Sequence, residues 1–96
     1  MYILATYDVD TISETGQKRL RKVAKLCKDY GRRVQNSVFE CELTEAQFIQ
    51  LKEALSEVID KNLDSLRFYH LNKNENHRIE TIGKNANFNI NDAIII

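Results

Sequence analysis

Apolar and polar residues alternate at the start of the chain, with Ile3, Ala5 and Tyr7 on one side of residues 2–8. This period of two predicts a β-strand, and the strand ends at the acidic residue Asp8. A polar loop should follow it. The first element therefore places a carboxylate at the junction between a regular strand and a loop.

The next segments predict a helix and two strands. From residue 17 to residue 30, apolar side chains recur at the spacing of one helical face, at Leu20, Val23, Ala24 and Cys27. Gly31 stands where a left-handed C-cap is expected. Residues 32–43 are rich in β-branched and aromatic side chains and are interrupted by Asn36 and Ser37. This pattern predicts two short strands or one sharply kinked strand.

The second helix is indicated by its first turn. Thr44 and Gln47, three residues later, form a capping box, and the helix that follows should end near Asp60. Its apolar residues share one face, at Phe48, Leu51, Leu55, Val58 and Ile59. Two further strands are expected at residues 65–71 and 77–82, with a polar loop between them.

The order strand, helix, two strands, helix, strand predicts an α+β fold of the ferredoxin-like βαββαβ type. Both helices then cover one face of an antiparallel sheet. We expect one domain over residues 1–96, and a homodimer with stacked sheets that covers the other face. The tail, about residues 84–96, ends in three isoleucines. We expect it to form an extra C-terminal strand on the partner subunit's sheet edge, or alternatively to fold back onto its own chain.

The chain has no net charge, because 14 Lys and Arg residues balance 14 Asp and Glu residues, but the charges are unevenly distributed. Residues 17–33 hold a single acid and a group of cations, namely Lys18, Arg19, Arg21, Lys22, Lys25, Lys28, Arg32 and Arg33. Since salt screens charges beyond about 8–10 Å, such a segment can bind phosphate on a neutral protein. The alternative is a helix face that is simply solvated.

Nothing in the composition indicates export. No N-terminal apolar run is long enough for a signal peptide or a membrane span, so we expect a cytoplasmic protein without a membrane partner. Cys27 and Cys41 are too few for a disulfide framework or a cysteine metal site, and we expect them in the core. His70 and His77 are expected to have structural or solvated roles.

The candidate chemistry lies at the end of the first strand. A carboxylate such as Asp8 is costly there unless it caps a turn, meets a cation or faces a solvated cleft. With Asp10 and Glu14 it makes an oxygen-rich segment suited to Mg²⁺ or Mn²⁺, which take one or two protein carboxylates together with water and substrate phosphate. The alternative is an Asx turn. In a dimer, two copies of Asp8 would meet across the two-fold axis and share one divalent ion.

Several segments resemble one known family, in the family's order. They are Tyr7-Asp8-Val9, KRLRKVAK at residues 18–25, GRRVQNSVFECEL at 31–43, DSLRFYHL at 64–71 and ETIG at 80–83. Together they cover nearly the whole chain and resemble the CRISPR-associated Cas2 family. The resemblance implies a ferredoxin-like homodimer whose C-terminal strand adds to the partner's sheet. It also implies a Mg²⁺ site on Asp8.

The resemblance also implies a function. Family members are described as metal-dependent endonucleases acting on single-stranded RNA, double-stranded DNA or both, and as adaptors that bridge integrase dimers during CRISPR spacer acquisition. The positions implied as neighbours of the site are Tyr7, Arg33, Ser37 and Phe39. The loop with Asp10 varies among relatives. We expect Asp8 to be the catalytic metal ligand, and Arg33, with Arg19 and Lys22 of the basic segment, to contact nucleic-acid phosphates without reading sequence.

Two other functions fit the same residues. The chain would serve as a non-catalytic DNA-binding scaffold of the integrase complex, because the same basic surface would hold duplex DNA. A small-ligand regulatory module is a further reading, since ferredoxin-like domains host many unrelated functions. The cluster of cations argues against the regulatory module, and no feature of the sequence separates the nuclease from the scaffold.

Overall fold

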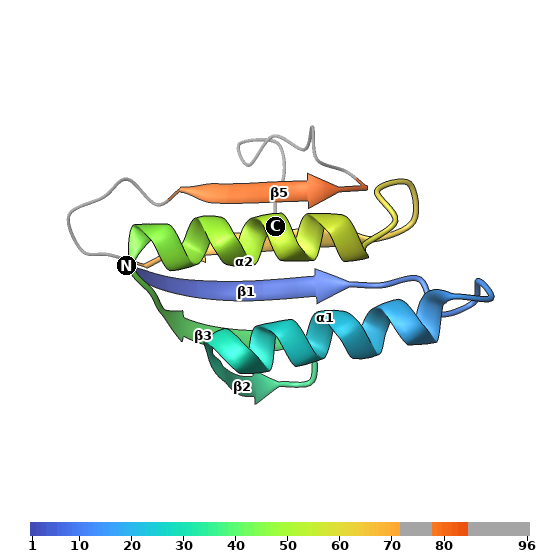
Figure 1. Ribbon diagram of the computed structural model, residues 1–96, viewed down its shortest axis with the longest axis horizontal. Coiled ribbons are helices and arrows are strands. Elements are labelled where there is room, and N and C mark those ends of the chain that lie inside the picture. Colours follow the sequence, from blue (N-terminus) through green and yellow to red (C-terminus); the bar gives the residue numbers. More distant parts are fainter. Residues whose placement is uncertain (72–77, 85–96) are drawn as a thin grey trace, which may run out of the picture.

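A computed structural model describes residues 1–71 and 78–84 of the chain. In chain order the elements are β1 (Tyr2–Asp8), α1 (Gly16–Tyr30), β2 (Arg32–Gln35), β3 (Val38–Glu42), α2 (Glu45–Val58), β4 (Ser65–His70) and β5 (Ile79–Gly83) (Figure 1). Each predicted helix and strand is present. The segment 32–43 forms two strands joined by a turn at Asn36 and Ser37, rather than one kinked strand.

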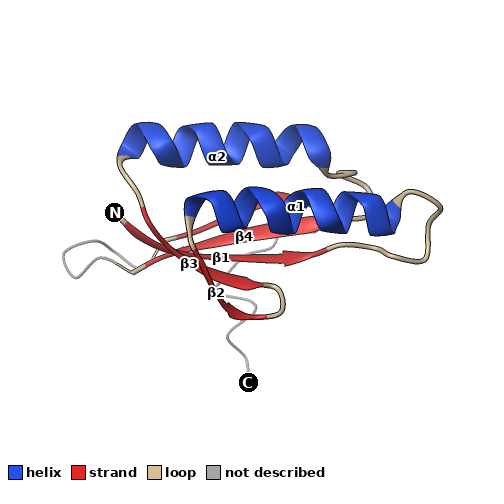
Figure 2. Ribbon diagram, turned by 60° about the horizontal axis from the view of Figure 1, so that its bottom comes forward, coloured by secondary structure: helices blue, strands red, loops and turns tan. Residues whose placement is uncertain are grey.

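The five strands form one antiparallel sheet in the order β2-β3-β1-β4-β5. β1 is the central strand, with β3 on one side and β4 on the other. Figure 2 shows both helices on the same face of the sheet. With β5 as an additional edge strand, this is the ferredoxin-like α+β arrangement predicted from the order of elements.

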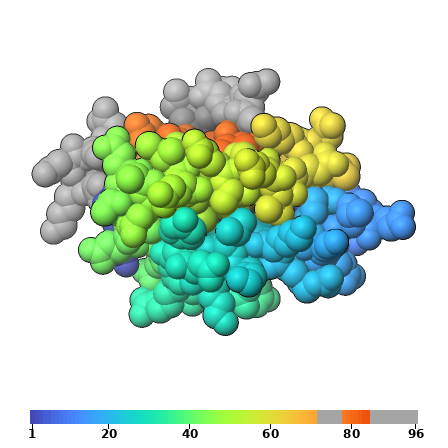
Figure 3. Space-filling model, viewed as in Figure 1, coloured from blue at the N-terminus to red at the C-terminus, as the bar shows by residue number. Residues whose placement is uncertain are grey.

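The core lies between the helices and the sheet, and alternation along the strands decides which side chains enter it. On β1, Ile3, Ala5 and Tyr7 are buried and the intervening residues are more exposed. The predicted apolar faces of both helices are confirmed, with Val23, Cys27, Phe48, Leu51 and Leu55 buried. Figure 3 shows the two helices side by side on one face of the molecule. Apart from Arg19, the basic side chains of α1 consequently lie on the outer surface.

Cys27 and Cys41 are buried free thiols, as the sequence predicts. Burial raises the pKa of Cys27 to about 12 and the pKa of Cys41 to about 11. Because only the thiolate is an effective nucleophile or metal ligand, neither sulfur takes part in such chemistry near neutral pH. Both act as small apolar core residues.

The first turn of α2 has the predicted capping box. Thr44 Oγ1 accepts a hydrogen bond from the Gln47 amide at 3.1 Å, and Gln47 Oε1 accepts one from the Thr44 amide at 2.9 Å. The flanking apolar residues, Leu43 and Phe48, are both buried, as a hydrophobic staple requires. The helix ends at Val58, two residues before the predicted end.

The prediction of a left-handed C-cap at Gly31 is wrong. Gly31 has extended backbone angles, φ −156° and ψ −164°, because the chain passes directly from α1 into β2. Glycine is needed for a different reason. A Cβ atom at this position would lie 2.4 Å from the Glu40 carbonyl oxygen and 2.5 Å from the Cys41 sulfur. The absence of a side chain therefore lets the end of α1 approach β3 closely.

Gly83, at the end of β5, has a positive φ of 96°, and a Cβ atom there would lie 2.3 Å from the Asp64 carbonyl oxygen. We expect Gly83→Ala to lower the free energy of unfolding by about 2 kcal/mol, because backbone strain and steric overlap act together. Urea denaturation measures the change. The control Gln50→Ala, on the exposed side of α2, should change stability by less than about 0.5 kcal/mol. Equal effects of the two substitutions would contradict this account.

The C-terminal part of the chain is described only as far as Lys84, whose amide donates to the Asp64 carbonyl oxygen at 2.7 Å. β5 pairs with β4 of its own chain and ends one residue later than the predicted strand at 77–82. Apart from Lys84, the predicted tail at 84–96 lies outside the described residues, so its packing on a partner stays a prediction. No helix in the described part is long and apolar enough to cross a membrane.

Candidate functional site

Asp8 is the last residue of β1, the central strand of the sheet, and its register partner on β4 is Ser65. Tyr7, one residue earlier, is buried beneath the helices. Because successive side chains of a strand point to opposite faces, Asp8 belongs to the face that α1 and α2 do not cover. Its side chain is exposed. The fold thus presents this carboxylate on the open face of the sheet.

The carboxylate of Asp8 makes no hydrogen bond or ion pair with any residue that the structure describes. Asp10 differs, since its Oδ1 accepts a hydrogen bond from the Ile12 amide at 2.9 Å. That bond defines an Asx turn. The Asx-turn alternative therefore applies to Asp10, and the Asp8 carboxylate remains available to a cation.

The loop after β1 is held by a buried ion pair that starts at Asp64, a side chain with 0 % exposure. Asp64 accepts hydrogen bonds from Arg19 Nε at 2.8 Å, from the Asp10 amide at 3.0 Å and from the Asp60 amide at 2.9 Å. Arg19 Nη2 donates in turn to the Asp10 carbonyl at 3.3 Å and to Ser13 Oγ at 3.1 Å. The loop that follows Asp8 is therefore fixed at several points.

Arg19 does not lie on the exposed surface of the basic helix, where the sequence predicts that it contacts phosphates. Its side chain is 11 % exposed, and its guanidinium group bonds to Asp64 and to its own loop. The physical reason is that a buried carboxylate needs a cation close by. Lys22, three residues further along α1, is exposed as expected. The spacing of the basic residues along α1 did not distinguish the buried Arg19 from the exposed Lys22.

Asp64 is a site residue that sequence reasoning missed. Burial by itself raises the pKa of the Asp64 carboxyl, but hydrogen bonds from Arg19 and from the Asp60 and Asp10 amides outweigh it. The resulting pKa lies below its ordinary value of 3.8. The available signal was an acidic residue directly before an apolar strand, because a carboxylate in such a place requires compensation.

Three of the predicted neighbours of Asp8 lie on the opposite, helix-covered face of the sheet. Tyr7 and Phe39 are buried and their ring centroids lie 6.2 Å apart. The guanidinium carbon of Arg33 lies 5.1 Å from the centroid of Phe39. The Tyr7 hydroxyl donates to the Asn36 carbonyl at 3.1 Å, and burial raises the pKa of Tyr7. One chain by itself therefore does not place Arg33 beside the Asp8 carboxylate.

Ser37 contacts the end of β1 through its backbone, because its carbonyl oxygen accepts a hydrogen bond from the Tyr7 amide at 3.2 Å. This bond continues the pairing of β1 with the β2–β3 turn, next to Asp8. The predicted residues thus form two groups. Asp8 and Asp10 lie at the end of the central strand, whereas the buried Tyr7 and Phe39 and the exposed Arg33 lie on the helix-covered face.

A second ionic group, which the sequence did not predict, joins β5 to α2. Glu80 Oε2 lies 3.4 Å from Lys52 Nζ and 3.5 Å from His70 Nε2. His70 is 2 % exposed and meets the Phe48 ring edge-on at 5.2 Å, and its Nδ1 has no partner among the described residues. His70 has the structural role predicted for it. His77 lies outside the described residues.

Within residues 1–71 and 78–84, no group of three or more His, Cys, Asp or Glu side chains is placed to hold a metal ion. Among the candidate ligands in this part of the chain, the carboxylate of Asp8 is one that the structure leaves free and exposed. Mg²⁺ often binds through one or two carboxylates and keeps several water molecules. A single carboxylate fits such an ion only if water, substrate or another chain completes the coordination.

The fold and the site define the chain as a small ferredoxin-like α+β protein with a free carboxylate on the open face of its sheet. The family model described as CRISPR associated protein Cas2 matches residues 1–79. The chain belongs to this family. The resemblance seen in the sequence segments is thereby confirmed.

Relatives match the chain along nearly its whole length. A protein of Moorella thermoacetica, named CRISPR-associated endoribonuclease Cas2 1, is 51% identical over 96 residues, which is 100% of each chain. A protein of Halalkalibacterium halodurans, named CRISPR-associated endonuclease Cas2, is 50% identical over 95 residues, or 99% of each chain. The crystal structure of Streptococcus pyogenes Cas2 matches with a TM-score of 0.71 and 59% sequence identity, and covers 77% of this chain and 89% of that chain.

Proposed function

We propose that the protein is a divalent-metal-dependent endonuclease of a CRISPR system that works as a cytoplasmic homodimer. Its substrates would be phosphodiester bonds of single-stranded RNA, double-stranded DNA or both. The proposal rests on the exposed carboxylate of Asp8, which has no partner among the described residues at the end of the central strand. The names endoribonuclease and endonuclease, carried by the Moorella and Halalkalibacterium relatives, support the reaction class.

The homodimer is supported by the one-sided placement of α1 and α2 (Figure 2). The other face of the sheet carries apolar side chains such as Leu4 and Val38, which are half-buried. Burying this face against a second copy would remove apolar surface from water, at roughly 25 cal/mol per Å². Two copies that meet through these faces would bring their Asp8 carboxylates towards one another.

In this arrangement Asp8 of each copy would act as a ligand for one Mg²⁺ or Mn²⁺ ion. A bound ion of this kind supplies Lewis acidity to a phosphodiester and lowers the pKa of a coordinated water. The protein's own contribution is to hold the two carboxylates at the ends of rigid central strands. Lys22 and Arg33 would hold backbone phosphates without distinguishing bases.

The biological setting of the cleavage would be spacer acquisition, together with a CRISPR integrase protein. Membership of the Cas2 family supports this setting. The exposed lysines of α1, among them Lys18, Lys22 and Lys25, offer a surface for duplex DNA within such a complex. The same surface would also serve a non-catalytic scaffold, so the cleavage assay is the decisive test.

Removal of the metal tests the proposed reaction. Purified protein with Mg²⁺ should cleave labelled single-stranded RNA or duplex DNA, and a chelator should reduce the rate to background. Excess Mg²⁺ or Mn²⁺ should restore it, because these ions accept the same oxygen ligands. Cleavage that persists in chelator would contradict the metal dependence. Tight duplex binding without cleavage of either substrate would instead favour the scaffold.

A further inference from the structure

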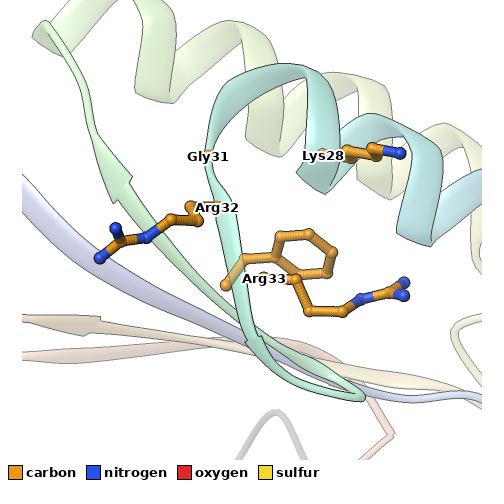
Figure 4. A pocket seen from close by; sticks show the side chains of 5 residues that line it. Lys28, Gly31, Arg32 and Arg33 are labelled. Carbon is orange, nitrogen blue, oxygen red and sulfur yellow. The ribbon is translucent and has the colours of Figure 1, made fainter.

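A pocket of about 430 Å³ lies between the C-terminal end of α1 and strand β2 (Figure 4). Its lining residues are Lys28, Gly31, Arg32, Arg33 and Phe39. Three of these five residues are cations and none is acidic. The volume falls within the range of pockets that hold small ligands, about 300–1,000 Å³. The pocket is thus a cationic hollow apart from the Asp8 carboxylate, and Arg33 is the residue that it shares with the proposed nuclease function.

The three cations of the pocket differ in direction and in pairing. Figure 4 shows the side chains of Lys28 and Arg33 extending to the same side of β2 and the side chain of Arg32 extending to the other. Arg32 Nη2 donates to Glu40 Oε2 at 2.8 Å, and this hydrogen bond lowers the pKa of Glu40. Neither Lys28 nor Arg33 forms an ion pair with a carboxylate of the described residues. Two uncompensated charges therefore face the same volume.

Arg33 is held in place by Phe39. The guanidinium carbon lies 5.1 Å from the ring centroid, which is a cation–π contact. Phe39 is fully buried, so its ring is not available to stack on a ligand. The pocket thus presents the planar guanidinium group of Arg33 against the Phe39 ring. Such a group can bind two oxygens of one phosphate at a low entropic cost.

We propose that this pocket binds a phosphate group of a nucleic acid through Lys28 and Arg33. The inference rests on the proposed function only for the choice of nucleic acid as the source of the phosphate. The oxygens of a phosphate can accept hydrogen bonds from an ammonium and a guanidinium group at once. A terminal phosphomonoester and an internal phosphodiester share this chemistry, and both fit a pocket that opens to solvent.

The position of the pocket has a consequence for cleavage. It lies beside the edge strand β2, whereas Asp8 lies on the central strand and on the other face. Two strand spacings, about 10 Å, separate β1 from β2. A nucleic acid that engages both places would pass around the β2 edge of the sheet. The pocket would then set which bond, counted from the held phosphate, reaches Asp8.

Ligands too small to contact other cations at the same time provide the test. Inorganic phosphate and a nucleoside 5′-monophosphate are titrated into the full chain, with the amide signal of Gly31 followed by NMR. We expect both ligands to shift this signal, and Lys28→Gln to weaken binding about three- to tenfold. The control Lys61→Gln removes the same charge from an exposed position in the loop between α2 and β4 and should leave the affinity unchanged.

A mononucleotide has no internucleotide bond, so this result is independent of whether the protein is a nuclease. Arg33→Lys should also weaken binding, because a lysine keeps the charge but lacks the planar fork. Equal affinities of the Lys28→Gln and Lys61→Gln proteins, or the absence of any shift at Gly31, would overturn the proposal.

Oligonucleotides with a 5′-phosphate or a 5′-hydroxyl, bound in the presence of a chelator, distinguish the two sources of phosphate. A preference for the 5′-phosphate that Lys28→Gln removes assigns the pocket to a strand end. If the two oligonucleotides bind equally well and Lys28→Gln weakens both to the same extent, the pocket is assigned to an internal phosphate. Oligonucleotide binding that Lys28→Gln and Lys18→Gln weaken to the same extent would count against the pocket, since it would indicate only general attraction to α1.

Discussion

Asp8→Asn is expected to abolish cleavage while the protein stays folded and dimeric. Asparagine has nearly the same shape but no charge, and the exposed Asp8 side chain forms no hydrogen bond or ion pair with the described residues. Loss of residues that merely support a metal ligand typically reduces activity or affinity 10- to 100-fold. Loss of the ligand itself should therefore reduce the cleavage rate by at least about 100-fold, as measured with labelled RNA and duplex DNA.

Asp29→Asn is the matched control, since it makes the same chemical change at an exposed position on α1. Asp29 pairs only loosely with Lys25, at 3.7 Å, and its replacement should leave cleavage unchanged. Mg²⁺ should raise the melting temperature of wild type and of this control but not of Asp8→Asn, because a ligand that binds the folded state stabilises it. Wild-type cleavage by pure Asp8→Asn protein would refute the metal role of Asp8.

Without metal, Asp8→Asn should not weaken the dimer, although it abolishes cleavage when metal is present. Two like charges brought close together destabilise each other, and removing them relieves the repulsion. In chelator, the Asp8→Asn dimer should therefore dissociate no more readily than the wild-type dimer when both are diluted. Sedimentation measures the dissociation. A wild-type chain that is monomeric at all concentrations would exclude the shared site while leaving the family membership intact.

Elements with strong local signals could be predicted from the sequence. The capping box of Thr44 and Gln47 determined the start of α2, and the alternation of residues 2–8 determined both ends of β1. These signals lie within a few residues of one another, so no knowledge of the rest of the fold is needed. The start of each element was consequently predicted better than the conformation at Gly31, which depends on where β3 lies.

The parts of the site that depend on distant residues could not be predicted. Arg19 and Asp64 are 45 residues apart in the chain, and no pattern in the basic segment distinguishes Arg19 from the exposed Lys22. The face of the sheet on which Arg33 lies could not be predicted either, because a register shift between Arg33 and Gln35 interrupts the alternation of β2. The sequence identified the chemistry of these residues but not the face on which each one lies.

Asp64→Ala is expected to lower the free energy of unfolding by about 3–5 kcal/mol, which is the usual effect of removing one partner of a buried ion pair. The substitution leaves the Arg19 guanidinium and two backbone amides without the acceptor they use. Small domains have only about 5–15 kcal/mol in total, so Asp64→Asn, which keeps the shape and one acceptor oxygen, provides a milder variant. Urea denaturation measures both. The Asp29→Asn control should change stability by less than about 0.5 kcal/mol.

The pH dependence of this effect has a definite sign. The folded state lowers the pKa of Asp64 below 3.8, so folding favours the carboxylate over the carboxylic acid. The stabilisation is then complete above about pH 5 and is lost as the pH falls through 3.8 towards the lowered value. The difference in stability between wild type and Asp64→Asn should therefore shrink over that range. A difference that stays constant from pH 7 to pH 3 would contradict the ionic role of Asp64.

The same variant shows whether the ion pair also positions the loop that follows Asp8. Asp10 donates its amide to Asp64, two residues beyond Asp8, so Asp64→Asn should speed hydrogen exchange at the Asp10 amide more than at the core strands. Cleavage should fall even at temperatures where the variant is fully folded, because a small misplacement of a reacting group lowers the rate strongly. If the Asp10 amide exchanges faster while cleavage is unchanged, Asp64 holds the loop but does not align Asp8.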